Sequence, residues 1–398
     1  MKKILFIIID GLADEPIKAL GDKTPLEAAQ KPNLNFLAQN GLCGSIEPFC
    51  FEWQKYPTSE DSILALLGFD PKRYKAGRGV YEALGAGLNL KSKDIALRVN
   101  FASVDKNLII KDRRAGRIED TKYLISSLNK IRIKNISFFF KKSLGHRAVL
   151  RLRSKKPLSS NITDNDPREV NKKPFQFEPK DRSLAAKFTA GALNDFINKA
   201  YFVLKSHFIN QERIRRNLFP ANYLLIRGAG SFKRVPSFKS AFKTKASFIA
   251  GGGLYKGIAK FLGINLINIK GATGNIKTDL KAKIDGTIKA LKKTDIVFLH
   301  IKAADNLAED GNFSGKRAFI ERIDKSLRPL ITLKDCLIVV TADHKTCCEK
   351  KSHCPGPVPF VIFGGDRNGT DSFDEKSCGK EKIPAKDFLK FVMSLQKK

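Results

Sequence analysis

The stretch that decides the fold is residues 3–11, which read KILFIIIDG. Its apolar residues do not alternate with polar ones, and they end in an aspartate and a glycine. Such a run is typical of a central parallel strand that is buried on both faces. The pattern returns as DIVFLHIKAAD at residues 295–305 and as CLIVVTADH at residues 336–344, with shorter apolar runs at residues 222–228 and 359–364.

Helical patterns lie between these predicted strands, for example at residues 278–293 and 316–333. Strands that alternate with helices indicate the α/β class. The sequence therefore predicts a three-layer core with a largely parallel sheet.

The composition limits the class of protein. The chain has 398 residues, enough for two or three domains, and 42% of them are hydrophobic, which excludes wholesale disorder. No apolar run approaches the roughly 20 residues of a membrane span, and Asp10 interrupts the first run, so we expect neither a membrane partner nor a signal peptide. Seven cysteines without paired spacing favour a reduced, cytoplasmic protein.

The net charge is +33, from 73 Lys and Arg against 40 Asp and Glu. A nucleic-acid binder concentrates such charge in a stripe, an arm or a recognition helix. Here the lysines are spread along the whole chain. We therefore expect mainly solvated surface charge, a small anionic substrate as the next interpretation, and no nucleic-acid partner.

The middle of the chain has a different pattern. Residues 90–183 contain alternating segments and a turn-rich stretch but few long helical patterns. This predicts a smaller α+β domain inserted into a core formed by residues 1–89 and 184–398. A long helical pattern at residues 184–206 is then expected to lead the chain back to the core.

Carboxylates follow the three longest predicted strands. Asp10, Asp305 and the pair Asp343-His344 each stand at or just beyond a strand end. Because ligands of open α/β sheets bind beyond the carboxyl ends of the strands, these side chains are expected to converge. Together with His353 they form a mixed oxygen and imidazole set that suits Mn²⁺, Zn²⁺ or Mg²⁺. A separate Cys/His zinc site within residues 343–354 is the less favoured alternative.

Ser59 is the candidate nucleophile. Residues 57–62 read PTSEDS and precede an apolar helical pattern, so Thr58 or Ser59 can act simply as the helix N-cap. A serine at a helix N-terminus beside a metal can also accept a phosphoryl group, because the metal lowers the pKa of its hydroxyl. The two roles are compatible.

Arginines gather in three short segments of the predicted inserted domain, at residues 111–117, 145–147 and 164–168. Arginine pairs with carboxylate and phosphate in bidentate geometry, so these segments favour a clamp for a small, doubly anionic substrate. The sequence contains no P-loop, no dinucleotide-binding fingerprint and no Gly-x-Ser-x-Gly element.

Over nearly its whole length the chain resembles the archaeal-type cofactor-independent (2,3-bisphosphoglycerate-independent) phosphoglycerate mutases of the alkaline phosphatase superfamily. The matching segments are residues 9–14 (IDGLAD), 24–29 (TPLEAA), 59–71, 77–87, 112–118 (DRRAGRI), 220–223 (PANY), 227–230 (RGAG), 271–274 (GATG) and 343–344 (DH).

The resemblance implies two divalent metal ions, with Mn²⁺ first and Mg²⁺ or Co²⁺ as substitutes, and no 2,3-bisphosphoglycerate. It assigns one ion to Asp10, Ser59, Asp343 and His344, and the other to Asp305 and His353. The family carries a further histidine ligand four positions after Asp305. This chain has Glu309 there, which would make the site harder and better suited to Mg²⁺ or Mn²⁺ than to Zn²⁺.

The resemblance also implies a mechanism in glycolysis and gluconeogenesis. Ser59 would take the phosphoryl group of 3-phosphoglycerate as a phosphoserine and return it to the 2-hydroxyl of the retained glycerate. The residues expected to bind the substrate are His146, Arg147, Asp166, Arg113, Arg114 and Lys256.

Three alternatives stay open at this point. The same scaffold serves metal-dependent phosphomonoesterases and homoserine-kinase-like paralogues, and the Glu309 departure is compatible with a degenerate, non-catalytic member. The oligomeric state, including a homo-oligomer, is also open.

Overall fold

The computed structural model describes residues 2–379 and 382–396. The chain divides into two compact units, and the second interrupts the first. The first unit comprises Met1–Lys75 and Pro236–Lys398, and the second comprises Ala76–Val235.

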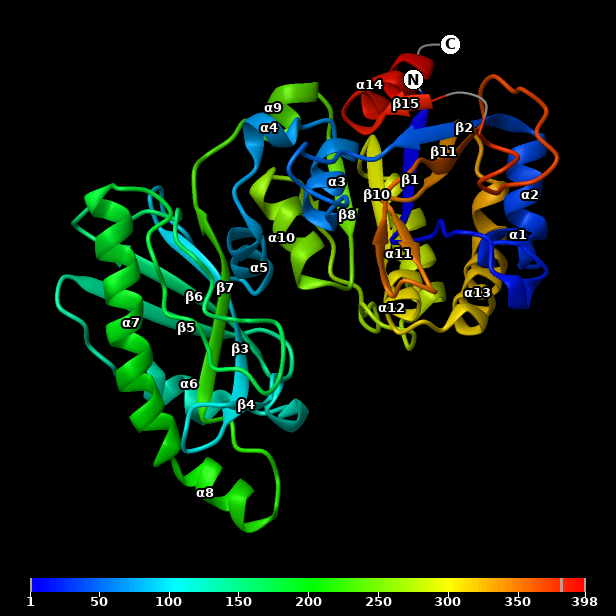
Figure 1. Cartoon of the computed structure of the whole chain (residues 1–398). Coiled ribbons are helices and arrows are strands. Elements are labelled where there is room, and N and C mark those ends of the chain that lie inside the picture. Colours follow the sequence, from blue (N-terminus) through cyan, green and yellow to red (C-terminus); the bar gives the residue numbers. More distant parts are fainter. Residues whose placement is uncertain (1, 380–381, 397–398) are drawn as a thin grey trace. The chain divides into compact units, whose positions relative to one another are not determined.

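The first unit is built on an eight-stranded sheet in the order β15-β2-β14-β11-β1-β10-β8-β9 (Figure 1). Strand β1 pairs in parallel with both β10 and β11, and β8 and β9 continue the parallel part. The strands are β1 (Lys3–Ile9), β2 (Gly41–Glu47), β8 (Ala246–Ile249), β9 (Asn265–Leu266), β10 (Ile296–Ile301), β11 (Cys336–Thr341), β14 (Val358–Phe363) and β15 (Lys382–Pro384). Every residue of β10 and β11 is buried, as expected of strands covered on both faces.

Helices cover this sheet in two layers (Figure 1). One layer holds α1 (Pro25–Ala28), α2 (Pro32–Gln39), α11 (Leu280–Leu291), α12 (Ala303–Glu309) and α13 (Phe313–Ile331). The other holds α3 (Ser59–Leu66), α10 (Gly253–Phe261) and α14 (Ala385–Leu395). Smaller elements of the unit are η1 (Lys18–Leu20), α4 (Pro71–Tyr74), α9 (Phe238–Phe242) and a separate hairpin of β12 (Lys345–Cys347) and β13 (Ser352–Cys354). The predicted three-layer α/β core with a largely parallel sheet is confirmed.

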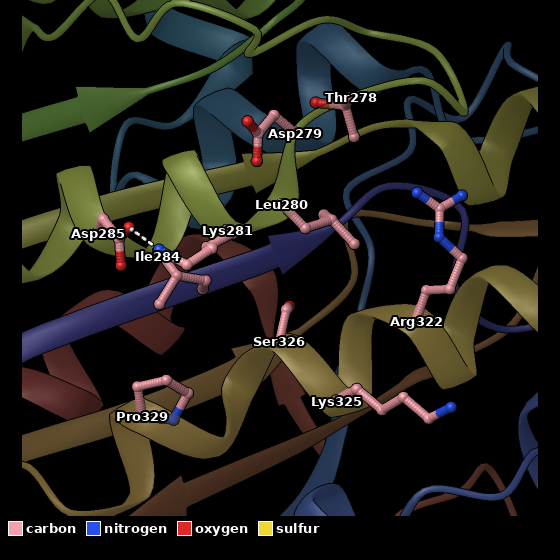
Figure 2. A pocket seen from close by; sticks show the side chains of 10 residues that line it. All are labelled: Thr278, Asp279, Leu280, Lys281, Ile284, Asp285, Arg322, Lys325, Ser326 and Pro329. Atoms are coloured by element: carbon pink, nitrogen blue, oxygen red, sulfur yellow. Dashed lines mark hydrogen bonds and ion pairs between the residues drawn. The ribbon is translucent and has the colours of Figure 1, made fainter.

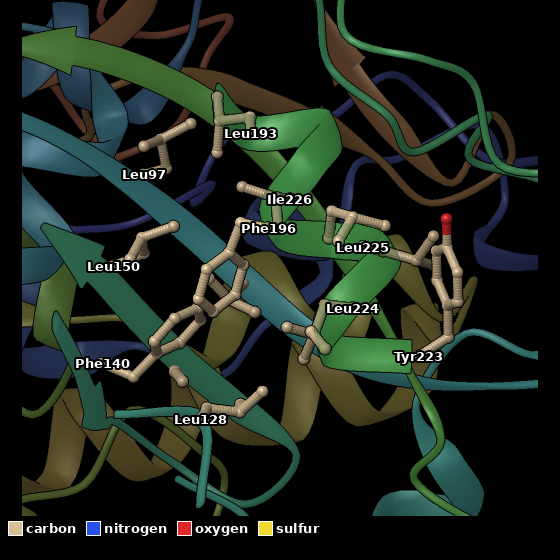
Figure 3. Packing of buried hydrophobic residues seen from close by; sticks show 14 of the residues in the cluster. Leu97, Leu128, Phe140, Leu150, Leu193, Phe196, Tyr223, Leu224, Leu225 and Ile226 are labelled. Atoms are coloured by element: carbon tan, nitrogen blue, oxygen red, sulfur yellow. The ribbon is translucent and has the colours of Figure 1, made fainter. Parts of the chain in front are cut away.

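The second unit is an antiparallel sheet with helices packed against it. Strand β3 pairs with β4, β6 and β7, and β5 pairs with β6. Its elements are α5 (Arg78–Gly85), β3 (Ile95–Val104), β4 (Ile110–Asp112), η2 (Ala115–Arg117), α6 (Lys122–Leu128), β5 (Ile136–Lys142), β6 (Arg147–Ser154), α7 (Leu184–Lys205), α8 (Phe208–Arg215) and β7 (Tyr223–Ser231). Figure 3 shows α7 presenting Phe196 to the sheet, where its ring stacks on Phe140 at a centroid distance of 5.3 Å.

The predicted boundaries of the inserted domain, residues 90 and 183, are wrong. The structure extends this unit to residues 76–235. Helix α5 packs on β3 and β7, and α7 supplies part of the hydrophobic core of the second unit instead of leading back to the first. The apolar run at residues 222–228, which suggested a strand of the main core, likewise forms β7 beside β3.

None of the described helices is long and apolar enough to cross a membrane.

Candidate active site

The ends of three central strands bring the predicted acids of the first unit together. Asp10 directly follows β1, and Asp343 and His344 follow β11, whose register pairs Ile8 with Thr341. Asp305 lies on α12, which begins shortly after β10, the other parallel neighbour of β1. The predicted convergence at the carboxyl ends of the strands is therefore present.

Gly11 allows this close approach. Its φ is +63°, a backbone conformation that favours glycine, and an added Cβ would lie 2.6 Å from Thr346 Oγ1 and 2.8 Å from Asp305 Cα. Its amide donates to Asp343 Oδ1 at 3.2 Å. The Asp-Gly dipeptide thus joins a strand end to the acids of two other elements.

Three of the predicted groups surround His344 Nε2. Ser59 Oγ lies 3.1 Å from this nitrogen, and Asp10 Oδ1 and Asp343 Oδ2 each lie 3.4 Å from it. Within the described residues, those two carboxylate oxygens are buried without a hydrogen-bond partner. Buried, unsatisfied carboxylate oxygens are costly unless a cation faces them, so this donor set fits a divalent metal ion.

The tautomer of His344 is consistent with a ligand role. Thr346 Oγ1 donates to Asp305 Oδ1 at 2.8 Å, so it accepts the contact from His344 Nδ1 at 3.2 Å. A proton on Nδ1 leaves the lone pair of His344 on Nε2, the nitrogen that faces the acids. Burial, followed by the nearby His353, lowers the pKa of His344 to about 3, which keeps the ring neutral.

A second group of possible ligands consists of Asp305, His353 and His344, whose ligand atoms lie within 4.8 Å of one another. His353 Nε2 is 3.5 Å from Asp305 Oδ1, and its ring stacks on that of His344 at 3.8 Å. His353 Nδ1 donates to the carbonyl of Pro57 at 2.8 Å, which directs Nε2 toward the acid.

Glu309 is not part of either group within the described residues. It stands four residues after Asp305 on α12 and is exposed. Partial loss of hydration and then the charge of Asp305 raise the pKa of its carboxyl, so the two acids are close enough to interact. A role for Glu309 as a ligand stays a prediction.

Lys302 is a site residue that the sequence pattern did not predict. Its Nζ lies 2.7 Å from Asp305 Oδ2 and 3.2 Å from Asp10 Oδ2, so one ammonium joins the two acids that were assigned to different ions. Burial raises the pKa of Asp10, but Lys302 and His300 outweigh it and bring the value to about 2. The sequence feature that could have indicated Lys302 is its position, directly after a buried strand and three residues before Asp305.

Tyr255 and His300 hold the other side of Asp10. The Tyr255 hydroxyl donates to Asp10 Oδ2, and its ring stacks on the fully buried His300 at 3.6 Å. His300 Nε2 is 3.4 Å from the same carboxylate oxygen. Three side chains thus face Oδ2 of Asp10, while Oδ1 is directed to the group around His344.

The start of α3 presents Ser59. Thr58 is the N-cap, because its hydroxyl accepts from the amide of Asp61. Ser59 is the first residue of the helix and is 5% exposed, and its hydroxyl contacts His344 rather than the backbone. The alternative left open by the sequence is resolved in this way: Thr58 caps the helix, and Ser59 faces the acids.

The second unit holds the predicted substrate residues Arg113, Arg114, His146, Arg147 and Asp166. Arg113 donates to both oxygens of Asp166, with Nη2–Oδ2 at 2.8 Å. Burial and then Arg147 and Arg114 lower the pKa of His146 to about 4. These side chains therefore share one electropositive environment.

Three further arginines and one glutamate of this cluster were missed. Arg227 lies 3.4 Å from Asp166, while Arg78 and Arg98 approach Glu82 at 3.5 and 3.9 Å. Burial lowers the pKa of Arg98 to about 9, although Glu82 opposes this. These arginines stand singly on α5, β3 and β7, so the sequence around each of them does not indicate a cluster. The pairing of the strands brings them close to the segments rich in arginine.

Lys256, the remaining predicted substrate residue, is on α10 of the first unit. Its Nζ donates to Asn268 Oδ1 at 3.3 Å. Among the described residues, the lysine that contacts the acids is Lys302, not Lys256. Substrate binding by Lys256 stays a prediction.

Cys347 and Cys354 form a disulfide across the β12–β13 hairpin, so the expectation that all cysteines are reduced is wrong for this pair. No cysteine spacing in the sequence indicated this pair, because the register of the hairpin is what brings the two residues together. The alternative zinc site within residues 343–354 loses these two thiolates.

A separate cavity of about 540 Å³ lies between α11 and α13 of the first unit (Figure 2). Its charged lining includes the pair Lys281–Asp285, in which the lysine is exposed. The lining contains none of the residues grouped around His344. It is an open groove with solvated charges.

Known proteins resemble the chain over almost its full length. A family model described as 2,3-bisphosphoglycerate-independent phosphoglycerate mutase matches residues 38–210. The chain is 42% identical to 2,3-bisphosphoglycerate-independent phosphoglycerate mutase 1 of Archaeoglobus fulgidus, covering 98% of this chain and 97% of the relative. It is 40% identical to the 2,3-bisphosphoglycerate-independent phosphoglycerate mutase of Sulfolobus acidocaldarius, covering 96% of this chain and 94% of the relative.

Solved structures agree with this relationship. A protein of Pyrococcus horikoshii superposes with a TM-score of 0.85 at 31% identity, covering 100% of this chain and 97% of that one. The cofactor-independent phosphoglycerate mutase of Thermoplasma acidophilum superposes with a TM-score of 0.71 at 32% identity and covers both chains fully. The chain belongs to the 2,3-bisphosphoglycerate-independent phosphoglycerate mutase family.

Proposed function

We propose that the chain is a metal-dependent phosphoglycerate mutase that interconverts 3-phosphoglycerate and 2-phosphoglycerate in the cytoplasm, as a step of glycolysis and gluconeogenesis. Family membership supports the reaction. The observation that carries the chemistry is the position of Ser59 Oγ, 3.1 Å from His344 Nε2, the same nitrogen that two buried carboxylate oxygens without a hydrogen-bond partner among the described residues approach at 3.4 Å.

Two divalent ions fit the two groups of ligands, with Mn²⁺ first and Mg²⁺ or Co²⁺ as substitutes. Asp10, Ser59, Asp343 and His344 would hold one ion, while Asp305 and His353, with Glu309 as a further candidate, would hold the other. When bound, the ions supply positive charge that lowers the pKa of the serine hydroxyl and stabilises the phosphoryl oxygens.

Ser59 is the proposed nucleophile. Its Oγ loses its proton and forms a bond to the phosphorus of 3-phosphoglycerate, the bond between phosphorus and the 3-oxygen breaks, and the 3-oxygen takes up a proton, leaving a phosphoserine and glycerate. The 2-hydroxyl of the same glycerate then attacks the phosphoserine and releases Ser59. Because the serine itself holds the phosphoryl group, 2,3-bisphosphoglycerate is not required.

The arginine cluster of the second unit is proposed to bind the small anionic substrate. Arg113, Arg114, Arg147 and His146 offer donors that match carboxylate and phosphate oxygens, and Asp166 fixes Arg113 by a bidentate pair. Glycerate that is kept bound reorients instead of being lost to water, which distinguishes a mutase from a phosphatase. We expect neither nucleic acid nor membrane as a partner, since the arginines are clustered around acids instead of forming a stripe.

The deciding experiment supplies 3-phosphoglycerate and Mn²⁺ without 2,3-bisphosphoglycerate and follows products by ³¹P NMR. We expect 2-phosphoglycerate to accumulate to equilibrium with little inorganic phosphate. Release of phosphate without 2-phosphoglycerate would show a phosphomonoesterase instead, and no turnover with Mn²⁺, Mg²⁺ or Co²⁺ would show a non-catalytic member.

A further inference from the structure

The β12–β13 hairpin carries side chains of different kinds on its two faces. The register places Thr346 opposite His353, with Cys347 and Cys354 one residue further along their respective strands. Successive residues of a strand point to opposite faces. Thr346 and His353 contact Asp305 on one face, and the Cys347–Cys354 disulfide therefore lies on the other.

The two strands of this hairpin are anchored unequally. On the β12 side, the amide of Thr346 donates to Ala13 O at 3.1 Å, and the buried Lys316 donates to Thr346 O at 2.9 Å. The amide of Cys348, directly after β12, donates to Asp14 at 3.1 Å. Strand β12 is therefore fixed to the loop that follows Asp10.

Among the described residues, strand β13 has fewer hydrogen bonds to the rest of the first unit than β12 has. It consists of three residues in a two-stranded sheet that is separate from the main one. Its histidine is held at Nδ1 by Pro57 O, and the ladder to β12 is short. Because an isolated hairpin of this size is marginally stable, a covalent link to the anchored strand restricts where His353 can lie.

We propose that the Cys347–Cys354 disulfide is a positioning element for the metal site of Asp305 and His353: it holds the imidazole of His353 in place for the second divalent ion. This inference rests on the metal role proposed above for His353. The first ion depends less on the disulfide, because His344 contacts Thr346 on the anchored strand.

The first measurement counts thiols. In unreduced, denatured protein we expect five reactive thiols, because Cys43, Cys50, Cys336, Cys348 and Cys378 are free. Seven reactive thiols would overturn the proposal.

The second measurement is Mn²⁺ binding by calorimetry. The double variant Cys347→Ser/Cys354→Ser is expected to bind the ion at Asp305 and His353, identified as the ion whose binding His353→Ala weakens, roughly tenfold less tightly, as for the loss of a residue that orients a ligand. Binding of the other ion should be unchanged. Cys50→Ser, which removes an exposed free thiol, is the matched control and should change neither site. Equal weakening of both ions, or of neither, would contradict the proposal.

A double-mutant cycle separates positioning from general stabilisation. His353→Ala removes the ligand that the disulfide is proposed to position, so adding the two serine substitutions to it should cost no further Mn²⁺ affinity. A persisting cost would indicate a merely structural disulfide.

Reduction provides an independent test. Dithiothreitol gives two electrons and two protons to the disulfide, which yields two thiols and oxidised, cyclic dithiothreitol. The reduced wild type should match the double-serine variant in Mn²⁺ binding, and the variant should not respond. Product formation by the wild type is measured separately, so failure of the mutase proposal is distinguishable from failure of this one.

Discussion

Ser59 Oγ lies 3.1 Å from His344 Nε2, although 285 positions separate the two residues in the chain. The start of α3 presents the serine, and the end of β11 presents the histidine. Ser59→Ala should therefore lower the mutase rate by roughly 10⁴-fold or more, because the phosphoryl acceptor is lost. The thermal midpoint should stay close to that of the wild type.

The control is Ser62→Ala on the same helix. Ser62 is buried, and its Oγ has no hydrogen-bond partner within the described residues, so both activity and stability should be retained. Substantial activity in Ser59→Ala would refute the assignment of the nucleophile.

Lys302→Met tests the ammonium that joins Asp10 and Asp305. Without it, two buried carboxylates lose their cationic partner, and the metal-free protein should lose about 3 kcal/mol of unfolding free energy. Saturating Mn²⁺ should restore much of this loss, because binding to the folded state adds stability. Thermal unfolding with and without Mn²⁺ measures both effects.

Lys283→Met is the matched control for this change. Lys283 is fully buried, whereas the side chain of Lys302 is 23% exposed, and Lys283 Nζ donates to the carbonyl of His300 instead of a carboxylate. The Lys283→Met variant should be less stable than the wild type, but Mn²⁺ should stabilise it by no more than it stabilises the wild type. An unchanged Mn²⁺ response in Lys302→Met would contradict the ion-pair interpretation.

Glu309→His tests whether this position contributes to the second metal site. An imidazole beside Asp305 and His353 should shift the preference from Mg²⁺ toward Co²⁺ and Zn²⁺, by roughly tenfold in the ratio of affinities. Calorimetry with each metal measures the ratio. Asp310→His, on the exposed neighbouring residue, should leave it unchanged, and the same lack of effect at position 309 would exclude Glu309 as a ligand.

His146→Gln tests the lowered pKa of His146, which burial and then the neighbouring arginines cause. Because the pKa of His146 is about 4 in the folded protein and about 6.5 when unfolded, only the unfolded chain binds a proton between these values. The stability from the neutral ring is complete above pH 6.5 and is lost as the pH falls toward 4.

Glutamine does not titrate, so the unfolding free energy of the variant should depend less steeply on pH than that of the wild type. The difference in slope is at most that of one proton, about 1.4 kcal/mol per pH unit. Urea unfolding at pH 5 and pH 7.5 measures this difference. An equal effect of the substitution at both pH values would contradict the depressed pKa.

The sequence predicted the central strands well because an uninterrupted apolar run leaves few alternatives to burial on both faces. It failed at the unit boundaries, because the apolar pattern of residues 184–206 shows that a helix has a buried face but not which sheet covers it. Glu309 shows the same limit. Its position in a motif suggested a ligand, but the rotation of α12 decides whether its carboxylate meets the others.

The sequence by itself determined the class of the fold, the acids at the strand ends, the serine at the helix start and the resemblance to a mutase family. These features are local, since each depends on residue type and spacing within a short segment. The tertiary structure alone decided which atoms meet: Lys302 between Asp10 and Asp305, the arginines that strand pairing adds to the second unit, and the link between Cys347 and Cys354. Such contacts depend on register and packing between distant segments, and no short stretch of sequence encodes them.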